Sequence, residues 1–115
     1  MSSFIYKIVP ASLWQAAETS GTFAGAPVDL ADGFIHFSTA AQVRETAARH
    51  FAEQGDLLLV AVDGDQLGEA LRLEVSRGGD LFPHLYGPLD PSLAAWVKPL
   101  PLDANGVHQF PEFTA

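Results

Sequence analysis

The sequence predicts an α+β fold, with five or six short strands and two main helices arranged in mixed order. The chain has 115 residues, enough for one domain around one core. Apolar residues make up 48% of it and charged residues 17%, which excludes a wholly disordered chain. Strand-like and helix-like apolar patterns follow one another without the regular alternation of a doubly wound fold. We therefore expect a single domain over residues 1–115, with a core at about 4–102 and an irregular tail at 103–115.

The chain is expected to begin with a strand followed by a short helix. Residues 4–9 are an aromatic and β-branched run with one lysine, and Pro10 stops the strand. Ser12 is a candidate cap for a helix over residues 13–19. Gly21 follows that segment and is typical of a helix end.

The clearest boundary in the sequence lies at the second helix. A loop through residues 25–27 leads to a short buried strand at 33–38. Thr39 can cap the helix, and Gln42 three residues later completes a capping box. Apolar side chains then recur at four-residue spacing, which predicts a helix from about 40 to 53. These side chains are Val43, Ala47 and Phe51.

The second half of the chain is expected to consist mainly of strands. Residues 57–62 are all apolar, as expected of a central strand. Residues 71–75 alternate between apolar and charged, which predicts a half-exposed strand. Extended segments at 81–86 and 93–100 complete the sheets. The connections are a turn at 63–65, a helical turn at 66–70 and a turn at 77–80.

Composition also limits the function. The chain has no cysteine, which excludes disulfides, thiolate catalysis and cysteine metal sites and fits a cytoplasmic location. The net charge of −8 argues against general binding to DNA or RNA. The longest apolar run, at 57–62, is too short to cross a membrane, and the first residues do not read as a secretory signal. We therefore expect a cytoplasmic protein whose partner is a small molecule.

Two segments place a histidine beside hydroxyl groups in an apolar context. The first contains His36, Ser38 and Thr39, and the second contains His84 and Tyr86. Histidine changes charge near neutral pH and can accept or donate a proton. Strand alternation puts His36 and Ser38 on one face, and Thr39 lies where the amides of a helix start attract anions. These residues are candidates for a small-ligand site.

Glu74 is the acidic candidate. It shares a strand face with Arg72, and its carboxylate can stabilise a cationic transition state or activate a hydroxyl. Structural roles stay open for all the candidates: a helix cap, a satisfied structural histidine, a braced turn or a solvated strand face. No phosphate-binding loop, nucleophile elbow or closely spaced histidine pair occurs, so no metal site is predicted.

Four motifs carry a resemblance to a known family. They are IYKI at 5–8, GFIHFST at 33–39 followed by Gln42 and Val43, RLE at 72–74, and FPHLYGP at 82–88. With these motifs, in this order over about 4–102, the chain resembles the bacterial family catalogued as domain of unknown function nine-five-two. That family is similar in fold to the ADP-ribosyltransferases, which hold NAD in a cleft between two small split sheets.

The resemblance implies particular site residues. ADP-ribosyltransferases typically use a His or Arg on the first strand, a Ser, Thr or Tyr on a middle strand and a Glu on a late strand. By resemblance, Ser38 and Thr39 take the second position and Glu74 takes the third. Where relatives often carry a histidine at the first position, this chain has Lys7. A lysine can reach a phosphate or ribose oxygen but cannot act as a neutral imidazole.

Three functions follow as hypotheses. In the first, the protein binds NAD or a related nucleotide as a substrate, with no firm cofactor, and transfers or cleaves at the ribosyl centre. Its expected residues are Glu74 and His36 as catalytic groups, and Lys7, Ser38, Thr39, His84 and Tyr86 as ligand-binding groups. The second is a non-catalytic ligand-binding or interaction module on the same fold. The third is a small hydrolase in which His36 or His84 pairs with Glu74 to activate water.

Overall fold

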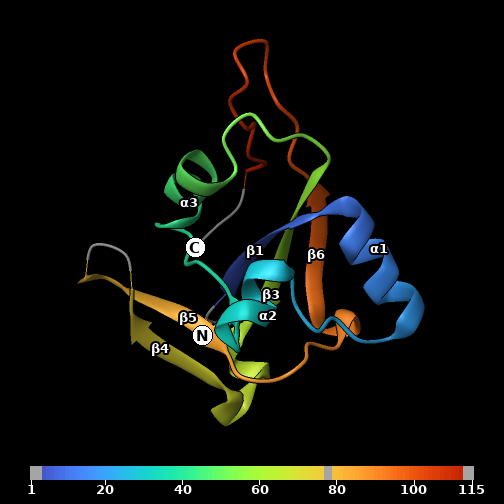
Figure 1. Cartoon of the computed structure of the whole chain (residues 1–115), viewed down its shortest axis with the longest axis vertical. Coiled ribbons are helices and arrows are strands. Elements are labelled where there is room, and N and C mark those ends of the chain that lie inside the picture. The colour runs from blue at the N-terminus through green and yellow to red at the C-terminus, as the bar shows by residue number, and fades with distance from the viewer. Residues whose placement is uncertain (1–3, 77–78, 113–115) are drawn as a thin grey trace.

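The computed structural model describes residues 4–76 and 79–112 and contains two three-stranded antiparallel sheets (Figure 1). The first sheet has the order β1-β3-β6 and consists of β1 (Phe4–Pro10), β3 (Leu57–Asp63) and β6 (Ala94–Pro99). The second has the order β2-β5-β4 and consists of β2 (Ile35–His36), β5 (Leu81–Leu85) and β4 (Leu71–Val75). The helices are α1 (Ala11–Ser20), α2 (Pro27–Asp32) and α3 (Val43–His50). The α+β prediction is confirmed.

The all-apolar strand is central, as its composition predicts. β3 lies between β1 and β6 and pairs antiparallel with both. Leu59, Val60 and Val62 in its middle are fully buried. A strand covered on both faces needs apolar side chains in both directions, which explains the unbroken run at 57–62.

Helices cover the two faces of the first sheet. Trp14 of α1 packs in the cluster that contains Val60 and Val62, and Val43 of α3 packs in the cluster that contains Leu57 and Leu59. Alternate residues of β3 therefore face opposite helices. This arrangement places α3 beside the segment that follows β2.

The two sheets are joined through one short segment. Ser38 and Tyr6 of β1 exchange backbone hydrogen bonds, with both N–H···O distances at 2.8 Å. On the other side, the Phe37 amide donates to the Pro83 carbonyl of β5 at 3.0 Å. The segment after β2 thus bridges the sheets and brings the two histidine-containing motifs together.

Both predicted helices begin differently from expectation. α1 starts at Ala11 directly after Pro10, and the exposed Ser12 makes no capping hydrogen bond. α3 starts at Val43 because residues 40–42 form a turn. Only part of the expected capping box is present, since the Gln42 Oε1 accepts from the Thr39 amide at 3.0 Å and no Thr39 side-chain bond caps the helix.

The helix α2 was not predicted, and the loop ends earlier than expected. Pro27 occupies its first turn, where a missing N–H costs nothing. The Asp29 carboxylate accepts from the Ala26 amide at 2.7 Å, and Gly33 ends the helix at φ 86°. Val28 and Leu30 are exposed, so no apolar face marked this helix in the sequence.

The remaining connections follow the predicted pattern where they are described. Short 3₁₀ turns lie at Gly64–Gln66 and Gly68–Ala70. Of the turn predicted at 77–80, residues 77 and 78 lie outside the described residues, and the Ser76 amide donates to the Asp80 carbonyl at 2.9 Å. Between 102 and 112 the chain contains a turn at 104–105 and an isolated bridge between Leu102 and His108. None of the described helices has the length and apolarity to cross a membrane.

Candidate functional site

A cavity of about 660 Å³ lies where β1, the segment after β2, β5, α2 and α3 meet. Its volume is in the range of small-molecule sites. Four of the predicted site residues line it: Lys7, His36, Ser38 and His84. Thr39, Glu74 and Tyr86 are not among the described residues that line the cavity. Sequence motifs far apart in the chain therefore converge, although the predicted set divides in two.

Lys7 forms a buried ion pair with Asp29. The Nζ atom lies 2.9 Å from Oδ2 and 3.1 Å from Oδ1 of this carboxylate, and both side chains are shielded from solvent. Burial lowers the pKa of Lys7, and the Asp29 charge opposes that effect. The Lys7 ammonium, which we expected to bind a ligand oxygen, is therefore already paired with the Asp29 carboxylate.

Asp29 connects α2 to the strands around it. Besides the lysine, its Oδ1 accepts from the His36 backbone amide at 3.1 Å and lies 2.6 Å from the His36 Nδ1. Burial by itself raises the pKa of Asp29, but the bonds from His36, Lys7 and the Ala26 amide outweigh it and lower the pKa to about 2. No sequence pattern singled out Asp29, because it belongs to the unpredicted α2.

His36 contacts a carboxylate at each ring nitrogen. Its Nδ1 faces Asp29, and its Nε2 lies 2.9 Å from Oδ2 of Asp32. An ionised carboxylate only accepts hydrogen bonds, so both contacts are satisfied only when the ring is the doubly protonated imidazolium. In this state His36 has no lone pair with which to accept a proton, and it fits binding and positioning better than base catalysis.

His84 is held by the carboxylate of Glu74. The His84 Nδ1 lies 2.8 Å from Oε1 of Glu74, and the Tyr86 hydroxyl donates to the same oxygen at 2.7 Å. These two hydrogen bonds lower the pKa of Glu74, and the Glu74 carboxylate raises the pKa of the Tyr86 phenol. Among the described residues nothing bonds to the His84 Nε2. With Nδ1 donating, this nitrogen carries the lone pair of a neutral imidazole.

Phe34 links the two hydrogen-bonded groups. Its ring stacks on His84 with centroids 4.1 Å apart and contacts the His36 ring at 4.6 Å. The Tyr86 ring lies 5.3 Å away, and the two histidine rings are 5.6 Å apart. Phe34 belongs to the predicted strand motif, but nothing in the sequence distinguished it from an ordinary core residue.

The hydroxyl candidates Ser38 and Thr39 separate. Ser38 is buried, and its Oγ lies 3.0 Å from the Thr46 Oγ1 of α3. Since the Thr46 hydroxyl donates to the Gln42 carbonyl at 3.2 Å, Ser38 is the donor of this pair. Thr39 instead lines a different groove, of about 510 Å³, beside Phe4 and Pro83. Ser38 and Thr39 therefore line different hollows of the structure.

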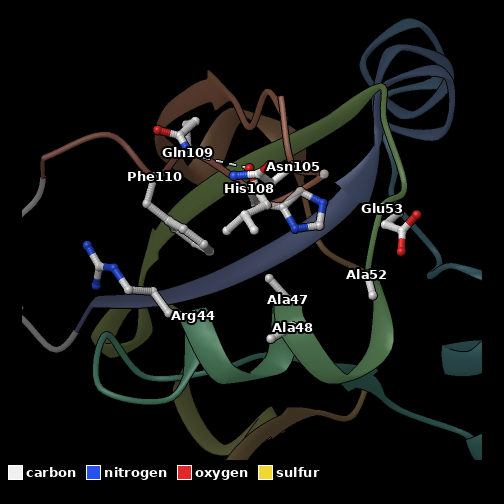
Figure 2. A pocket seen from close by; sticks show the side chains of 11 residues that line it. Arg44, Ala47, Ala48, Ala52, Glu53, Asn105, His108, Gln109 and Phe110 are labelled. Atoms are coloured by element: carbon white, nitrogen blue, oxygen red, sulfur yellow. Dashed lines mark hydrogen bonds between the residues drawn. The ribbon is translucent and has the colours of Figure 1, made fainter. Parts of the chain in front are cut away.

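A third hollow lies between α3 and the C-terminal tail (Figure 2). Its volume is about 490 Å³, and the Arg44 guanidinium lies 5.1 Å from the centroid of the Phe110 ring. None of the predicted site residues lines it. His108 is buried here, and its Nε2 lies 2.9 Å from the Gln54 carbonyl. In the part of the chain that the structure describes, no three His, Asp or Glu side chains are placed to hold a metal ion.

Comparisons with known proteins agree with this description of the fold. The chain is similar to the protein CC0527 from Caulobacter crescentus in its crystal structure, with 52% sequence identity and a TM-score of 0.89 over 92% of this chain and 93% of that one. The solution NMR structure of CC0527 gives 51% identity and a TM-score of 0.84 over 93% of this chain and 92% of that one. The search of curated proteins gave no match.

A family assignment also follows from the sequence. Residues 8–97 match the family described as "Protein of unknown function (DUF952)". This range contains β1 from Ile8 onward, both histidine motifs and Glu74, and ends within β6. The resemblance stated from the motifs is thereby confirmed: this chain belongs to the DUF952 family.

Proposed function

We propose that the cavity binds NAD or a related nucleotide, and that His84, held by Glu74, acts as the base in cleavage or transfer at the ribosyl centre. One observation carries the proposal: His84 lines the cavity while its Nδ1 lies 2.8 Å from Glu74, and its Nε2 has no partner among the described residues. A histidine fixed by a carboxylate in one tautomer is a common arrangement for proton transfer. The resemblance to ADP-ribosyltransferases supports the choice of nucleotide.

The proposed reaction is a displacement at the carbon that bears nicotinamide. The bond between that carbon and the pyridinium nitrogen breaks, and its electron pair leaves with neutral nicotinamide. A bond forms from the same carbon to the oxygen of water or of an acceptor hydroxyl. The proton of that oxygen passes to the His84 Nε2. The Glu74 carboxylate stabilises the imidazolium that forms, so Glu74 acts as a positioning residue through His84.

The other cavity residues have binding roles in this proposal. Ser38 has acceptor capacity left after donating to Thr46, so it can receive a hydrogen bond from a ribose hydroxyl. The His36 ring and the Lys7–Asp29 ion pair form a fixed polar wall that orients the ligand. Tyr86 donates to the same Glu74 oxygen that His84 contacts and shapes the site indirectly.

Calorimetric titration with NAD, followed by a nicotinamide-release assay, tests the proposal. We expect saturable binding and slow release by the unaltered protein. His84→Gln and Glu74→Gln should lower the rate by about 10²-fold or more, as expected for loss of a general base or its support. Glu18→Gln on the exposed face of α1 removes an equal charge away from the cavity and should leave the rate unchanged. Full turnover in Glu74→Gln would contradict the assignment.

A hydrolase that uses the same pair is the second candidate. The direct contact between His84 and Glu74 favours it, since such a pair can activate water against other substrates. His36 is a poorer partner in this scheme because its ring nitrogens face Asp29 and Asp32. Cleavage of ester or phosphoester substrates by a protein that does not bind NAD would favour this candidate. Binding of NAD without nicotinamide release would instead favour a non-catalytic module.

A further inference from the structure

We propose that two copies of this chain associate through the free edge of β4 and form one continuous antiparallel sheet, with a two-fold axis passing at Leu73. This inference concerns a surface outside the cavity and does not depend on the proposed chemistry. It rests on the backbone direction of β4, on its sequence pattern and on the apolar surface beside it.

The outer edge of β4 has unpaired backbone groups. β4 is the last strand in the order β2-β5-β4, and within the described residues it pairs only with β5 (Figure 1). The Tyr86 amide donates to the Ala70 carbonyl at 2.7 Å, which fixes Ala70, Arg72 and Glu74 as the positions bonded to β5. The backbone groups of the positions between them therefore point away from β5, and among them the Leu71 amide donates to the Gly68 carbonyl. These positions are Leu71, Leu73 and Val75.

When two β4 strands pair antiparallel, the outward-facing positions of one copy lie opposite the outward-facing positions of the other. With the axis at Leu73, Leu73 pairs with Leu73 of the second copy, and Leu71 pairs with Val75 of the second copy. The Leu73 pair can exchange both of its backbone hydrogen bonds, and the Val75 amide can donate to the Leu71 carbonyl of the second copy, whereas the Leu71 amide is already bonded to the Gly68 carbonyl. An axis at Arg72 or at Glu74 would also pair outward positions with each other, but it would place two arginines or two glutamates opposite each other, so the charges favour the axis at Leu73.

The side chains of β4 are also self-complementary. Residues 71–75 read Leu-Arg-Leu-Glu-Val, which is symmetric about Leu73 except that the charge changes sign. In the proposed register Arg72 lies opposite Glu74 of the second copy, and the same contact repeats across the axis. Such a pair lies between two hydrogen-bonded pairs, where facing Cα atoms are about 4.5 Å apart and side chains approach closely. A unit that carries a net charge of −8 would otherwise repel its copy, and these contacts place opposite charges at the shared edge.

The other face of the same strands is an exposed apolar surface. Leu73 is 61% exposed, Val75 is 69% exposed and Leu81, opposite Val75 on β5, is 51% exposed. The groove of about 510 Å³ that Thr39 lines also contains Leu71, Leu73 and Pro83, so it continues this surface. Pairing of two edges would bring the two copies of Leu73 together and place Val75 beside Leu71 of the second copy, which removes apolar surface from water.

The association would add a charge beside the candidate site. Arg72 of the second copy would lie next to Glu74, whose Oε1 already accepts from His84 and Tyr86. Within the described ranges the Oε2 of Glu74 has no hydrogen bond, and it is the oxygen left for such a contact. The second copy would thus help to fix the carboxylate that holds His84.

Sedimentation of the full chain at physiological salt over a range of concentrations tests this inference first. We expect a monomer–dimer equilibrium whose dissociation constant rises at least about tenfold in Leu73→Lys, because a lysine at a free edge blocks strand pairing. Leu30→Lys, on α2 at 63% exposure, is the matched control and should dimerise like the unaltered chain. A protein that is monomeric throughout, or a dimer insensitive to Leu73→Lys, would overturn the proposal.

A charge exchange tests the register. Arg72→Glu alone places two glutamates opposite each other at both contacts, and Glu74→Arg alone places two arginines there, so each variant should be monomeric. Their mixture brings opposite charges together at both contacts and should form a heterodimer. Circular dichroism of each variant checks that it is folded. If the two variants are folded and their mixture remains monomeric, the two-fold axis at Leu73 is contradicted.

Discussion

The buried carboxylate of Asp29 connects several parts of the candidate site. It accepts from the Lys7 ammonium, the Ala26 amide and both the backbone and the ring of His36. A carboxylate without solvent contact needs such donors, since burial of an unpaired charge is costly. Asp29 therefore fixes the position of α2 against β1 and β2.

The stability of the protein should depend on pH through Asp29. Its pKa of about 2 lies below the ordinary value of 3.8, so its contribution is fully present above pH 4 and is lost as the pH falls toward 2. The difference corresponds to about 2 kcal/mol of unfolding free energy. Urea unfolding between pH 2 and 6 measures it.

Asp29→Asn should flatten that pH dependence and lower stability at neutral pH by roughly 3–5 kcal/mol, because it leaves the Lys7 ammonium buried without its counter-charge. Asp32→Asn is the control, since its carboxylate is half exposed and contacts only the outer nitrogen of His36. We expect it to cost at most about 1 kcal/mol. Equal losses in the two variants would contradict the central position given to Asp29.

The Tyr86 phenol reports on Glu74. The Glu74 carboxylate accepts the Tyr86 hydrogen bond and opposes ionisation of the phenol, so it raises the pKa of Tyr86 above the ordinary value of 10.0. In Glu74→Gln the pKa of Tyr86 should fall back toward that value. Ultraviolet titration measures phenol ionisation, and Tyr86→Phe identifies the contribution of the other tyrosine. An unchanged titration in Glu74→Gln would show that the contact is absent in solution.

At the scale of elements, the close approach of Gly25 to Asp29 fixes the position of the start of α2. Gly25 has a φ of 125°, and a Cβ there would lie 2.7 Å from the Asp29 Cβ. An added methyl group would therefore push α2 and its carboxylate away from Lys7. Gly21 also has a positive φ, of 88°, but a Cβ there would meet no atom within 4 Å.

Gly25→Ala should thus destabilise the protein by roughly 1–3 kcal/mol more than Gly21→Ala, since both positions have a positive φ but only the Cβ at position 25 overpacks. Urea unfolding of the two variants gives the difference. Equal losses would mean that α2 has room to move without disturbing the rest of the protein.

Sequence patterns predicted the elements that bury a regular apolar face. The all-apolar run gave β3, the alternating run gave β4, and the four-residue spacing of Val43 and Ala47 gave α3. The helix α2 has no such face, since Val28 and Leu30 are exposed. Its ends were marked by Pro27 and Gly33, but turn residues of this kind occur equally in loops.

The division of the candidate site has a related cause. Alternation correctly placed His36 beside Ser38 and Glu74 beside Arg72, because strand geometry fixes which side chains share a face. It could not show that Glu74 meets the cavity only through His84, since that depends on the pairing of β4 with β5. Alternation also could not show that Ser38 and Thr39 line different hollows, because the turn at residues 40–42 changes the direction of the chain.

At the scale of the whole molecule, the site depends on how the two sheets are joined. The hydrogen bonds between Tyr6 and Ser38 bring the segment after β2 onto the edge of β1. Lys7 of the first sheet and His84 of the second then line one cavity. The site is therefore a property of the complete arrangement, and no single motif forms it alone.

The histidine side-chain nitrogen resonances during a titration with NAD test the central claim most directly, because they show where a ligand binds whether or not it reacts. His36 and His84 line the cavity, whereas His108 is bonded to the Gln54 carbonyl beside the tail. We expect the first two to shift with one saturation curve and His108 to stay unchanged. Resonances of His36 and His84 that do not move at high NAD concentration, in a folded protein, would contradict the account.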